Sequence, residues 1–384
     1  MAEEKDFESM EERGKDTTVN SATDEKSVGG LERVLKALRK SVVGKRKVIR
    51  EEAESPKGPV GLDIGTTHIV LAQNKPNYIE TIQDLNAFFT VPSARFAEQI
   101  LNQKEVMYYR HENQYYIIGY SAEGFANMFH GNTRRPVKEG LLSPDEVEGL
   151  SVIKAIVNGL IEKPKKFGEM LCFIIPGEPL DGTGSVIYHE SVIKSFLGSL
   201  GYSPLSINEG MAVVVSELSE DDFTGIGISM GGGMCNVCLS YLSFPVITYS
   251  IQKGGDYIDT MVGAAVGEPA TKVKTIKEEE LDFSREPKDR VGIALGIFYD
   301  ELILKLLESL QRVLSSTGKI PKIKTPIPIV LSGGTAMPKG FKEKFEKLLK
   351  NVNLPVEISA VRLAEDLLNA PAKGALATAI REAG

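Results

Sequence analysis

The sequence contains, in two places, a pair of apolar strands joined by a tight turn of small residues. The first copy spans 61–70 and the second spans 227–237. Because glycine lacks a Cβ atom, the backbone N–H groups of such a turn can converge on an anion. A single glycine-rich turn is usually only a hairpin tip. Two copies, one in each half of the chain, predict that a nucleotide phosphate is bound between them.

The length and composition indicate a soluble globular protein of two domains. The 384 residues can form a sizeable core, and 42% hydrophobic with 25% charged residues is an ordinary balance. The net charge of −7 argues against nucleic acid as a partner, because binding it needs positive surface charge. No apolar run reaches the roughly 18 residues of a membrane span, and no signal peptide opens the sequence. We therefore expect a cytoplasmic protein.

The three cysteines, Cys172, Cys235 and Cys238, form no framework of the secreted type, which is consistent with a reducing compartment. Cys235 and Cys238 have the CxxC spacing of redox and metal sites. They fall in an apolar return strand, however, where residues three apart point to opposite faces. We favour buried apolar cysteines over a redox or metal pair.

The first 57 residues differ from the rest of the chain. Residues 1–26 are polar and acid-rich, and we expect them to be disordered. Apolar residues from Leu31 to Val42 then recur at helical spacing, and eight basic residues lie from Arg33 to Arg50 with no acid between them. This pattern predicts a basic amphipathic helix over 31–50. It could bind an anionic membrane surface or an acidic partner, or it could be a solvated linker.

From Pro59 onward, segments typical of strands alternate with segments typical of helices. This alternation predicts an α/β fold, in which ligands bind at the carboxyl ends of the strands. The expected strands beyond the two glycine hairpins are 89–95, 106–110, 115–119, 171–176 and 328–331. The expected helices are 144–160, 191–200, 292–314 and 371–381.

Asp63 lies in the first glycine hairpin and is followed by Gly65, Thr66 and Thr67. A carboxylate at this position can hold a hydrated Mg²⁺ ion, while hydroxyl and N–H groups bind phosphate oxygens. Asp63 could equally cap the turn, as aspartate often does. This segment alone does not distinguish the two interpretations.

Further motifs follow in a fixed order, and together they resemble the actin superfamily, which also contains the heat-shock chaperone ATPases and the sugar kinases. Asp63–Thr66 is similar to the first phosphate loop of that superfamily, and Gly231–Gly233 is similar to the second. The other similar segments are the two connecting helices (207–212 and 374–377), the adenosine motif (330–338), the segment after the second loop (254–259) and the MreB-type Arg-Pro…Gly segment (134–140).

The resemblance covers almost all of 58–384 and implies a two-domain actin-like fold. Each domain would be a mixed sheet flanked by helices, with a nucleotide cleft between the domains. Domain I would span 58–206 with a small outer subdomain near 75–135, and domain II would span 207–364 with an outer subdomain near 262–292. Residues 365–384 would form a C-terminal helix that returns to domain I.

The resemblance also implies a site for ATP and Mg²⁺. Asp63 would hold the metal ion, and Glu209 would position the attacking water. Residues that would contact phosphate are Asp63, Gly65, Thr66, Thr67, Ser229, Gly231, Gly232 and Gly233. Residues that would contact adenosine are Lys277, Glu278, Gly333, Gly334, Thr335 and Met337. Alternatively, Lys277 and Glu278 are exposed charges on a helix, and Glu209 makes an ordinary interdomain polar contact.

Two positions depart from the superfamily pattern. Ser229 stands where the second loop normally begins with aspartate, and Met234 replaces a polar residue after the glycines. The site therefore lacks one carboxylate and one hydroxyl. Loss of one preorganised polar group commonly costs about 10²–10³ in rate. We therefore expect a slow ATPase or a nucleotide sensor.

The core of the chain has the size of actin or MreB, with no room for a chaperone's substrate-binding domain. No convincing motif supplies the sugar-facing aspartate of a sugar kinase. The leading hypothesis is an actin-like cytoskeletal protein that binds ATP and Mg²⁺ and polymerises head to tail into filaments. The alternative is a non-polymerising adaptor or nucleotide-dependent scaffold, and a small-molecule kinase is a third hypothesis.

Overall fold

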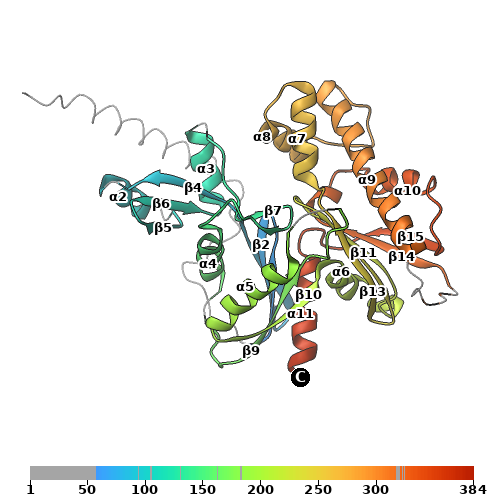
Figure 1. Ribbon diagram of the computed structural model, residues 1–384, viewed down its shortest axis with the longest axis horizontal. Coiled ribbons are helices and arrows are strands. Elements are labelled where there is room, and N and C mark those ends of the chain that lie inside the picture. The colour runs from blue at the N-terminus through green and yellow to red at the C-terminus, as the bar shows by residue number, and fades with distance from the viewer. Residues whose placement is uncertain are drawn as a thin grey trace, which may run out of the picture. The chain divides into compact units, whose positions relative to one another are not determined.

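The computed structural model describes residues 58–384, except for 94, 104–105, 130, 162, 182–183, 317–320, 322 and 324. The predicted tail and the predicted basic helix over 31–50 lie outside the described residues. Within the described part, strands alternate with helices, and the predicted α/β class is confirmed (Figure 1). No described helix combines the length and the hydropathy of a membrane span.

The first glycine hairpin belongs to a five-stranded mixed sheet with the order β10-β9-β1-β2-β3. Strand β1 is antiparallel to β2 and parallel to β9, and β9 is parallel to β10. Helices α4 and α5 pack on one face of this sheet. The elements are β1 (Val60–Ile64), β2 (His68–Lys75), β3 (Tyr78–Leu85), β9 (Glu169–Ile175), β10 (Tyr202–Asn208), α4 (Gly149–Leu160) and α5 (Val186–Ser199).

The second glycine hairpin belongs to another five-stranded mixed sheet, with the order β13-β12-β11-β14-β15. Reversed, this order matches the first sheet strand for strand, with β11 antiparallel to β12 and parallel to β14. The two halves of the chain therefore share one topology. The strands are β11 (Gly225–Met230), β12 (Cys235–Tyr241), β13 (Phe244–Ile251), β14 (Ile327–Ser332) and β15 (Ile358–Leu363).

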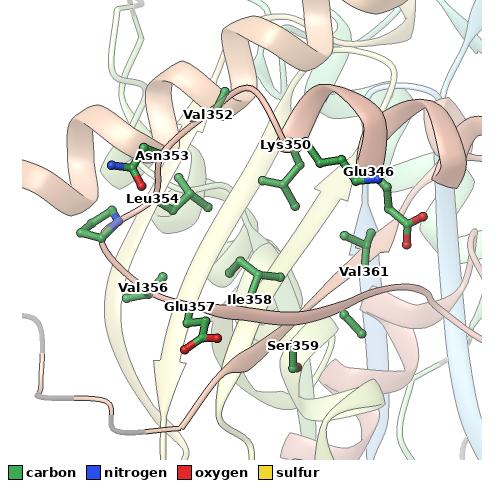
Figure 2. A pocket seen from close by; sticks show the side chains of 13 residues that line it. Glu346, Lys350, Val352, Asn353, Leu354, Val356, Glu357, Ile358, Ser359 and Val361 are labelled. Atoms are coloured by element: carbon green, nitrogen blue, oxygen red, sulfur yellow. The ribbon is translucent and has the colours of Figure 1, made fainter.

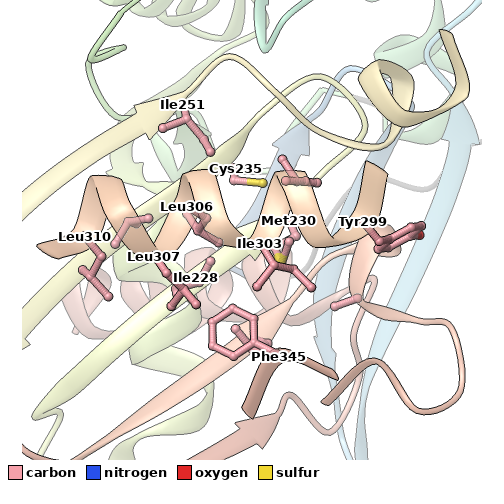
Figure 3. Packing of buried hydrophobic residues seen from close by; sticks show 14 of the residues in the cluster. Ile228, Met230, Cys235, Ile251, Tyr299, Ile303, Leu306, Leu307, Leu310 and Phe345 are labelled. Atoms are coloured by element: carbon pink, nitrogen blue, oxygen red, sulfur yellow. The ribbon is translucent and has the colours of Figure 1, made fainter. Parts of the chain in front are cut away.

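Helices α9 (Arg290–Ser316) and α10 (Phe341–Leu349) cover one face of the second sheet. Figure 3 shows Ile303, Leu306 and Leu310 of α9 packed over Ile228 and its neighbours on the strands. These α9 residues recur every three or four positions, which is the spacing of one helix face. The apolar period of the sequence therefore accounts for this contact.

Smaller elements are attached to each sheet. A three-stranded sheet, β4-β6-β5, begins at Phe88. Strand β3 pairs with β2, so the five-stranded sheet includes residues within the predicted outer subdomain near 75–135. The domain boundaries stay a prediction. These elements are β4 (Phe88–Pro92), α2 (Arg95–Gln103), β5 (Tyr108–His111), β6 (Gln114–Ile118), α3 (Tyr120–Met128), β7 (Val137–Lys138), β8 (Leu141–Leu142), α7 (Gly255–Val266) and α8 (Ala270–Glu279).

Two helices cross closely, with α6 (Glu209–Glu217) packed on the second sheet and α11 (Ala370–Ala383) packed on the first. Helix α6 follows β10, and helix α11 packs against α6, β1 and β9 (Figure 1). A Cβ atom at Gly374 would lie 1.9 Å from the Ala212 carbonyl oxygen, and one at Gly61 would lie 2.3 Å from the Ala372 carbonyl oxygen. Glycine is required at both positions because backbone occupies the space of any side chain.

All three cysteines are buried and free. Cys235 packs in the core beneath α9, whereas Cys238 packs against Met211 of α6 on the other face of β12. Burial raises the pKa of the Cys172 and Cys238 thiols to about 12. The interpretation of the cysteines as buried apolar residues is confirmed.

Candidate functional site

The first turn closes on itself and contacts a neighbouring turn. The Gly65 N–H group donates to the His68 carbonyl oxygen at 2.9 Å. Thr66 is buried, and its Oγ1 accepts a hydrogen bond of 3.1 Å from the Gly140 N–H group in the β7–β8 turn. Asp63 is half-buried in β1 just before the turn.

The second turn lies against the start of α7. The Gly255 N–H group donates to the Gly231 carbonyl oxygen at 3.0 Å, and the Asp256 N–H group donates to the Gly232 carbonyl oxygen at 2.8 Å. Thr335 Oγ1 donates to Gly231 as well, at 2.9 Å. The bonds from Gly255 and Asp256 satisfy the first N–H groups of α7, which have no partner inside the helix itself.

The two turns lie directly against each other. A Cβ atom at Gly232 would be 2.3 Å from Thr67 Oγ1, and one at Gly233 would be 2.4 Å from Thr66 Oγ1. The structure therefore brings together the two glycine turns that occur in the two halves of the sequence. Any side chain at Gly232 or Gly233 would collide with the threonines of the first turn.

The β7–β8 turn joins both glycine turns. A Cβ atom at Gly140 would lie 2.3 Å from Met234, and Arg135 Nη1 lies 2.6 Å from Asp256 Oδ2. The Arg-Pro…Gly segment, noted in the sequence only as a family feature, thus contributes Arg135 and Gly140 to this region. Sequence reasoning did not identify Arg135 or Asp256 as site residues.

Glu209 is the first residue of α6 and is half-buried. Asn236 Nδ2 donates to Glu209 Oε2 at 2.5 Å, and Asn236 Oδ1 accepts from the Gly177 N–H group at 2.8 Å. Removal from water raises the pKa of Glu209 to about 7, and a hydrogen bond from the Ser229 side chain partly opposes that rise. The Ser229 hydroxyl, predicted to contact phosphate, therefore contacts Glu209.

Asp63 and Glu209 interact through their charges. Burial, and then the negative charge of Glu209, raises the pKa of Asp63 well above its usual range. Two carboxylates that share one site repel each other, so each favours a bound proton or a nearby cation. The described residues hold no cluster of three or more His, Cys, Asp or Glu side chains that could bind a metal ion alone.

The two predicted charges on α8 point in different directions. Lys277 is buried, with its Nζ 2.8 Å from the Asp259 carboxylate and 3.0 Å from the Gly255 carbonyl oxygen. Glu278 is exposed, 3.9 Å from Lys274. Burial raises the pKa of Asp259 to about 6, although Lys277 opposes the rise. Lys277 lies beside the second turn, and Glu278 does not contact it.

The predicted adenosine motif follows β14. Gly333 has a φ angle of 94°, and a Cβ atom there would lie 2.3 Å from the Met230 carbonyl oxygen. Gly334 and Met337 are exposed, whereas Thr335 is buried and bonded to the second turn. The structure thus places Thr335 with the glycine turns and leaves Met337 at the surface.

Two buried asparagines near the turns were not predicted. Asn236 is fully buried on β12 and holds Glu209. Asn86 is fully buried as well: its side chain donates to the Gly65 carbonyl oxygen at 2.8 Å, and its N–H group donates to the Thr67 carbonyl oxygen at 2.9 Å. In the sequence, a polar residue within an apolar segment indicates such a buried asparagine, but it does not identify the group to which the asparagine is hydrogen-bonded.

A separate groove lies beside the edge strand β15 and the end of α10. Figure 2 shows Leu354, Ile358 and Val361 among the residues that line its apolar part, with Lys350 and Glu357 near its rim. None of the predicted nucleotide residues lines this groove. We therefore assign the candidate site to the glycine turns.

Replacement of Glu209 by glutamine should change the pH dependence of stability. Between about pH 4.5 and pH 7 the folded protein retains the Glu209 proton while the unfolded chain has released it. The contribution of Glu209 to the free energy of unfolding therefore falls as pH rises through this window. The free energy of unfolding of Glu209→Gln minus that of the wild type should therefore be larger at pH 8 than at pH 5. We expect this change to be on the order of 2 kcal/mol.

Urea denaturation of both proteins from pH 5 to pH 8 measures this difference. The pKa of buried His189 is lowered to about 4, which gives the opposite slope below pH 6.5, but this contribution cancels between the two proteins. Parallel curves for wild type and variant would show that Glu209 titrates normally.

A family model described as Volactin matches residues 59–379. Comparison with curated proteins found no match. Among solved structures, a MamK double helical filament has a TM-score of 0.61 at 17% identity, covering 85% of this chain and 98% of that chain.

Two further solved structures are similar. Ethanolamine utilization protein EutJ from Carboxydothermus hydrogenoformans has a TM-score of 0.51 at 18% identity, covering 91% of this chain and 99% of that chain. MreB 5 of Spiroplasma citri bound to AMPPNP has a TM-score of 0.54 at 11% identity, covering 82% of this chain and 94% of that chain. These similarities establish the fold, and the predicted actin-like fold is confirmed.

Proposed function

Because the chain belongs to the Volactin family and has an actin-like fold, we propose that it is an actin-like cytoskeletal protein that binds ATP with Mg²⁺ and polymerises into filaments. The single observation that carries nucleotide binding is the direct apposition of the two glycine turns, with Gly232 and Gly233 against Thr67 and Thr66. Glycine backbone on one side and threonine hydroxyls on the other form the kind of surface that can cradle phosphate oxygens.

The carboxylates beside the turns fit a magnesium ion. Mg²⁺ is typically held by one or two carboxylates together with substrate phosphates and waters, so a set of three protein ligands is not needed. Asp63 is the proposed ligand, and its pKa is raised first by burial and then by the negative charge of Glu209, both of which a bound cation would offset. When bound, the ion would neutralise charge on the phosphates and on Asp63.

Glu209 is the proposed group that orients the attacking water. Asn236 and Ser229 hold its carboxylate, and its pKa of about 7 lies near the optimum for a general base at neutral pH. Ser229 adds no negative charge to the site. We therefore propose slow hydrolysis that loosens the filament after assembly.

Self-association is supported by the filament named for MamK. The alternative is a nucleotide-dependent scaffold that does not polymerise, and the engagement of Ser229 with Glu209 favours it. In that case the site would bind nucleotide with little turnover and switch partner binding. Cytoplasmic location is part of the proposal in both cases.

Calorimetry with ATP and Mg²⁺ tests the nucleotide proposal, and heat of binding with saturation at one site per chain is expected. Light scattering and negative-stain microscopy in ATP and Mg²⁺ then test assembly. Nucleotide binding without filaments over a wide range of concentration and salt would favour the scaffold. Absence of any purine triphosphate binding would rule out both.

Replacement of Gly233 by alanine should weaken ATP binding about tenfold or more, because the new methyl group lies 2.4 Å from Thr66 Oγ1 and 2.8 Å from the Gly140 nitrogen. Gly296→Ala, in α9 with no atom within 4 Å of the added carbon, is the matched control and should bind normally. Calorimetric titration of each variant gives the two dissociation constants. Equal dissociation constants for the two variants would show that nucleotide binding does not depend on the contact between the turns.

A further inference from the structure

The first turn of α3 lies against α8, the helix that carries two of the residues predicted to contact adenosine. Lys274 Nζ on α8 is 3.8 Å from Glu123 Oε1 in the first turn of α3, and 3.9 Å from Glu278 Oε1 on its own helix. Lys277 and Glu278 are the predicted adenosine contacts on α8. The start of α3, which belongs to the first half of the chain, is therefore close to the predicted position of the base.

Tyr120 is the first residue of α3 and lies near both α8 and the first glycine turn. It is 42% exposed, and its ring centroid is 6.4 Å from that of His68, which directly follows the first turn. Burial, and then the negative charge of Asp84, raises the pKa of the Tyr120 hydroxyl, and the charge of Glu278 adds to the rise. The ring is therefore within reach of Glu278 on one side and of the first turn on the other.

The backbone that carries this ring is fixed in place. The Tyr120 N–H group donates to Asp84 Oδ1 at 2.8 Å, and Gln83 Nε2 donates to the Tyr120 hydroxyl at 3.4 Å. Gly119 has a φ angle of 67°, and a Cβ atom there would lie 2.3 Å from Asp84 Oδ2. Because the ring is positioned before a ligand arrives, a contact with it would cost little further conformational entropy.

The predicted base contacts lack an aromatic ring and all come from the second half of the chain. Lys277 is engaged by the Asp259 carboxylate at 2.8 Å, so its ammonium group already has a partner. The full set of predicted adenosine contacts is Lys277, Glu278, Gly333, Gly334, Thr335 and Met337.

We propose that the Tyr120 ring stacks on the base of the bound nucleotide and so adds a contact from the first half of the chain. Aromatic side chains stack on the flat face of any base, so this contact strengthens binding without selecting ATP over GTP. The inference rests on the proposed function and assigns a base-binding residue to it. A base held in this way joins α3 to the second half of the chain.

Calorimetric titration of the full chain with ATP and Mg²⁺ is the first test. Tyr120→Ala should raise the dissociation constant for ATP about tenfold, because it removes the stacked ring. The dissociation constant for inorganic tripolyphosphate, which has no base, should not change. Tyr120→Phe retains the ring and should bind ATP as the wild type does. Tyr78→Ala is the matched control, because Tyr78 is 61% exposed and lies at the opposite end of β3 from Asp84.

The outcomes separate this inference from the proposed function. If the wild type and Tyr120→Ala bind ATP equally well, the stacking contact is overturned and the proposed function stands. An equal loss of affinity for ATP and for tripolyphosphate would also overturn it, because the ring would then act on the phosphate turns. If the wild type binds no ATP, the proposed function falls and this inference falls with it.

Fluorescence gives a second and local readout. The sequence contains no tryptophan, so Tyr120→Trp introduces a single indole reporter that can itself stack on a base. ATP with Mg²⁺ should quench its emission, whereas tripolyphosphate with Mg²⁺ should leave the emission unchanged. Tyr78→Trp should respond to neither. Equal quenching of Tyr120→Trp by both ligands, or no quenching at an ATP concentration that saturates the calorimetric titration, would overturn the proposal.

Discussion

Replacement of Gly374 by alanine is expected to destabilise the protein by about 3 kcal/mol or more. The added carbon would lie 1.9 Å from the Ala212 carbonyl oxygen and 2.7 Å from the Ala212 carbonyl carbon. Both atoms are backbone of α6, so no rotation of a side chain can relieve the collision. Helix α11 would have to move away from α6, and this movement would disturb the contact that α11 makes with β1.

Urea denaturation measures this effect as a change in the free energy of unfolding. Gly198→Ala in α5 is the matched control, because no atom lies within 4 Å of its added carbon. Alanine forms helix better than glycine, so the control should be neutral or slightly stabilised. A loss below about 1 kcal/mol for Gly374→Ala would mean that the helices separate easily.

Replacement of Lys277 by methionine is expected to cost about 3–5 kcal/mol, because it leaves the buried Asp259 carboxylate without its cation. The double variant Lys277→Met with Asp259→Leu removes both charges and should recover most of this loss. Lys272→Met is the control on the same helix. Its ion pair with Glu268 is solvent-exposed, and its loss should cost at most about 1 kcal/mol.

The loss in Lys277→Met should depend on pH. The pKa of Asp259 is already raised to about 6, and Lys277 holds it down. Without Lys277 that pKa rises further, so the folded state binds the proton over a wider range than the unfolded chain does. Stability then falls as pH rises, and the variant should lose more at pH 8 than at pH 5. A loss that is equal at both values would mean that Asp259 does not carry the effect.

The features that the sequence predicted are those that depend on one segment at a time. Glycine at 231–233 permits a turn without a Cβ atom wherever the turn lies, and apolar alternation in β1 and β11 follows from the pleat of a strand. The apposition of the two turns could be proposed because they occur twice at equivalent places. The matching order of strands in the two sheets shows why: each turn joins the same two strands of one topology.

Features that depend on register between distant segments could not be predicted. Ser229 on β11 lies opposite Asn236 on β12, so both side chains reach Glu209 at the start of α6. The register of that pair is set by the length of the turn and the packing of both strands. A sequence can give the residues, but not this choice of partner.

Orientation on a helix was also out of reach. Lys277 and Glu278 are neighbours on α8, and adjacent helical residues differ by about 100° in direction. Only the packing of α8 on α7 fixes which of them is buried, and Asp259 of α7 selects Lys277. The salt bridge between Arg135 and Asp256 joins segments that no periodicity connects.

The position of α11 has a consequence for protein synthesis. This 14-residue helix covers one face of the sheet that contains β1 and β9, yet it leaves the ribosome after every strand of both sheets. Until it emerges, the nascent chain exposes Cys172, Ile174 and Val70 on that face. The first sheet is translated before the second, yet this face of it is covered only after α11 has been made, which creates a period in which chaperones can bind it.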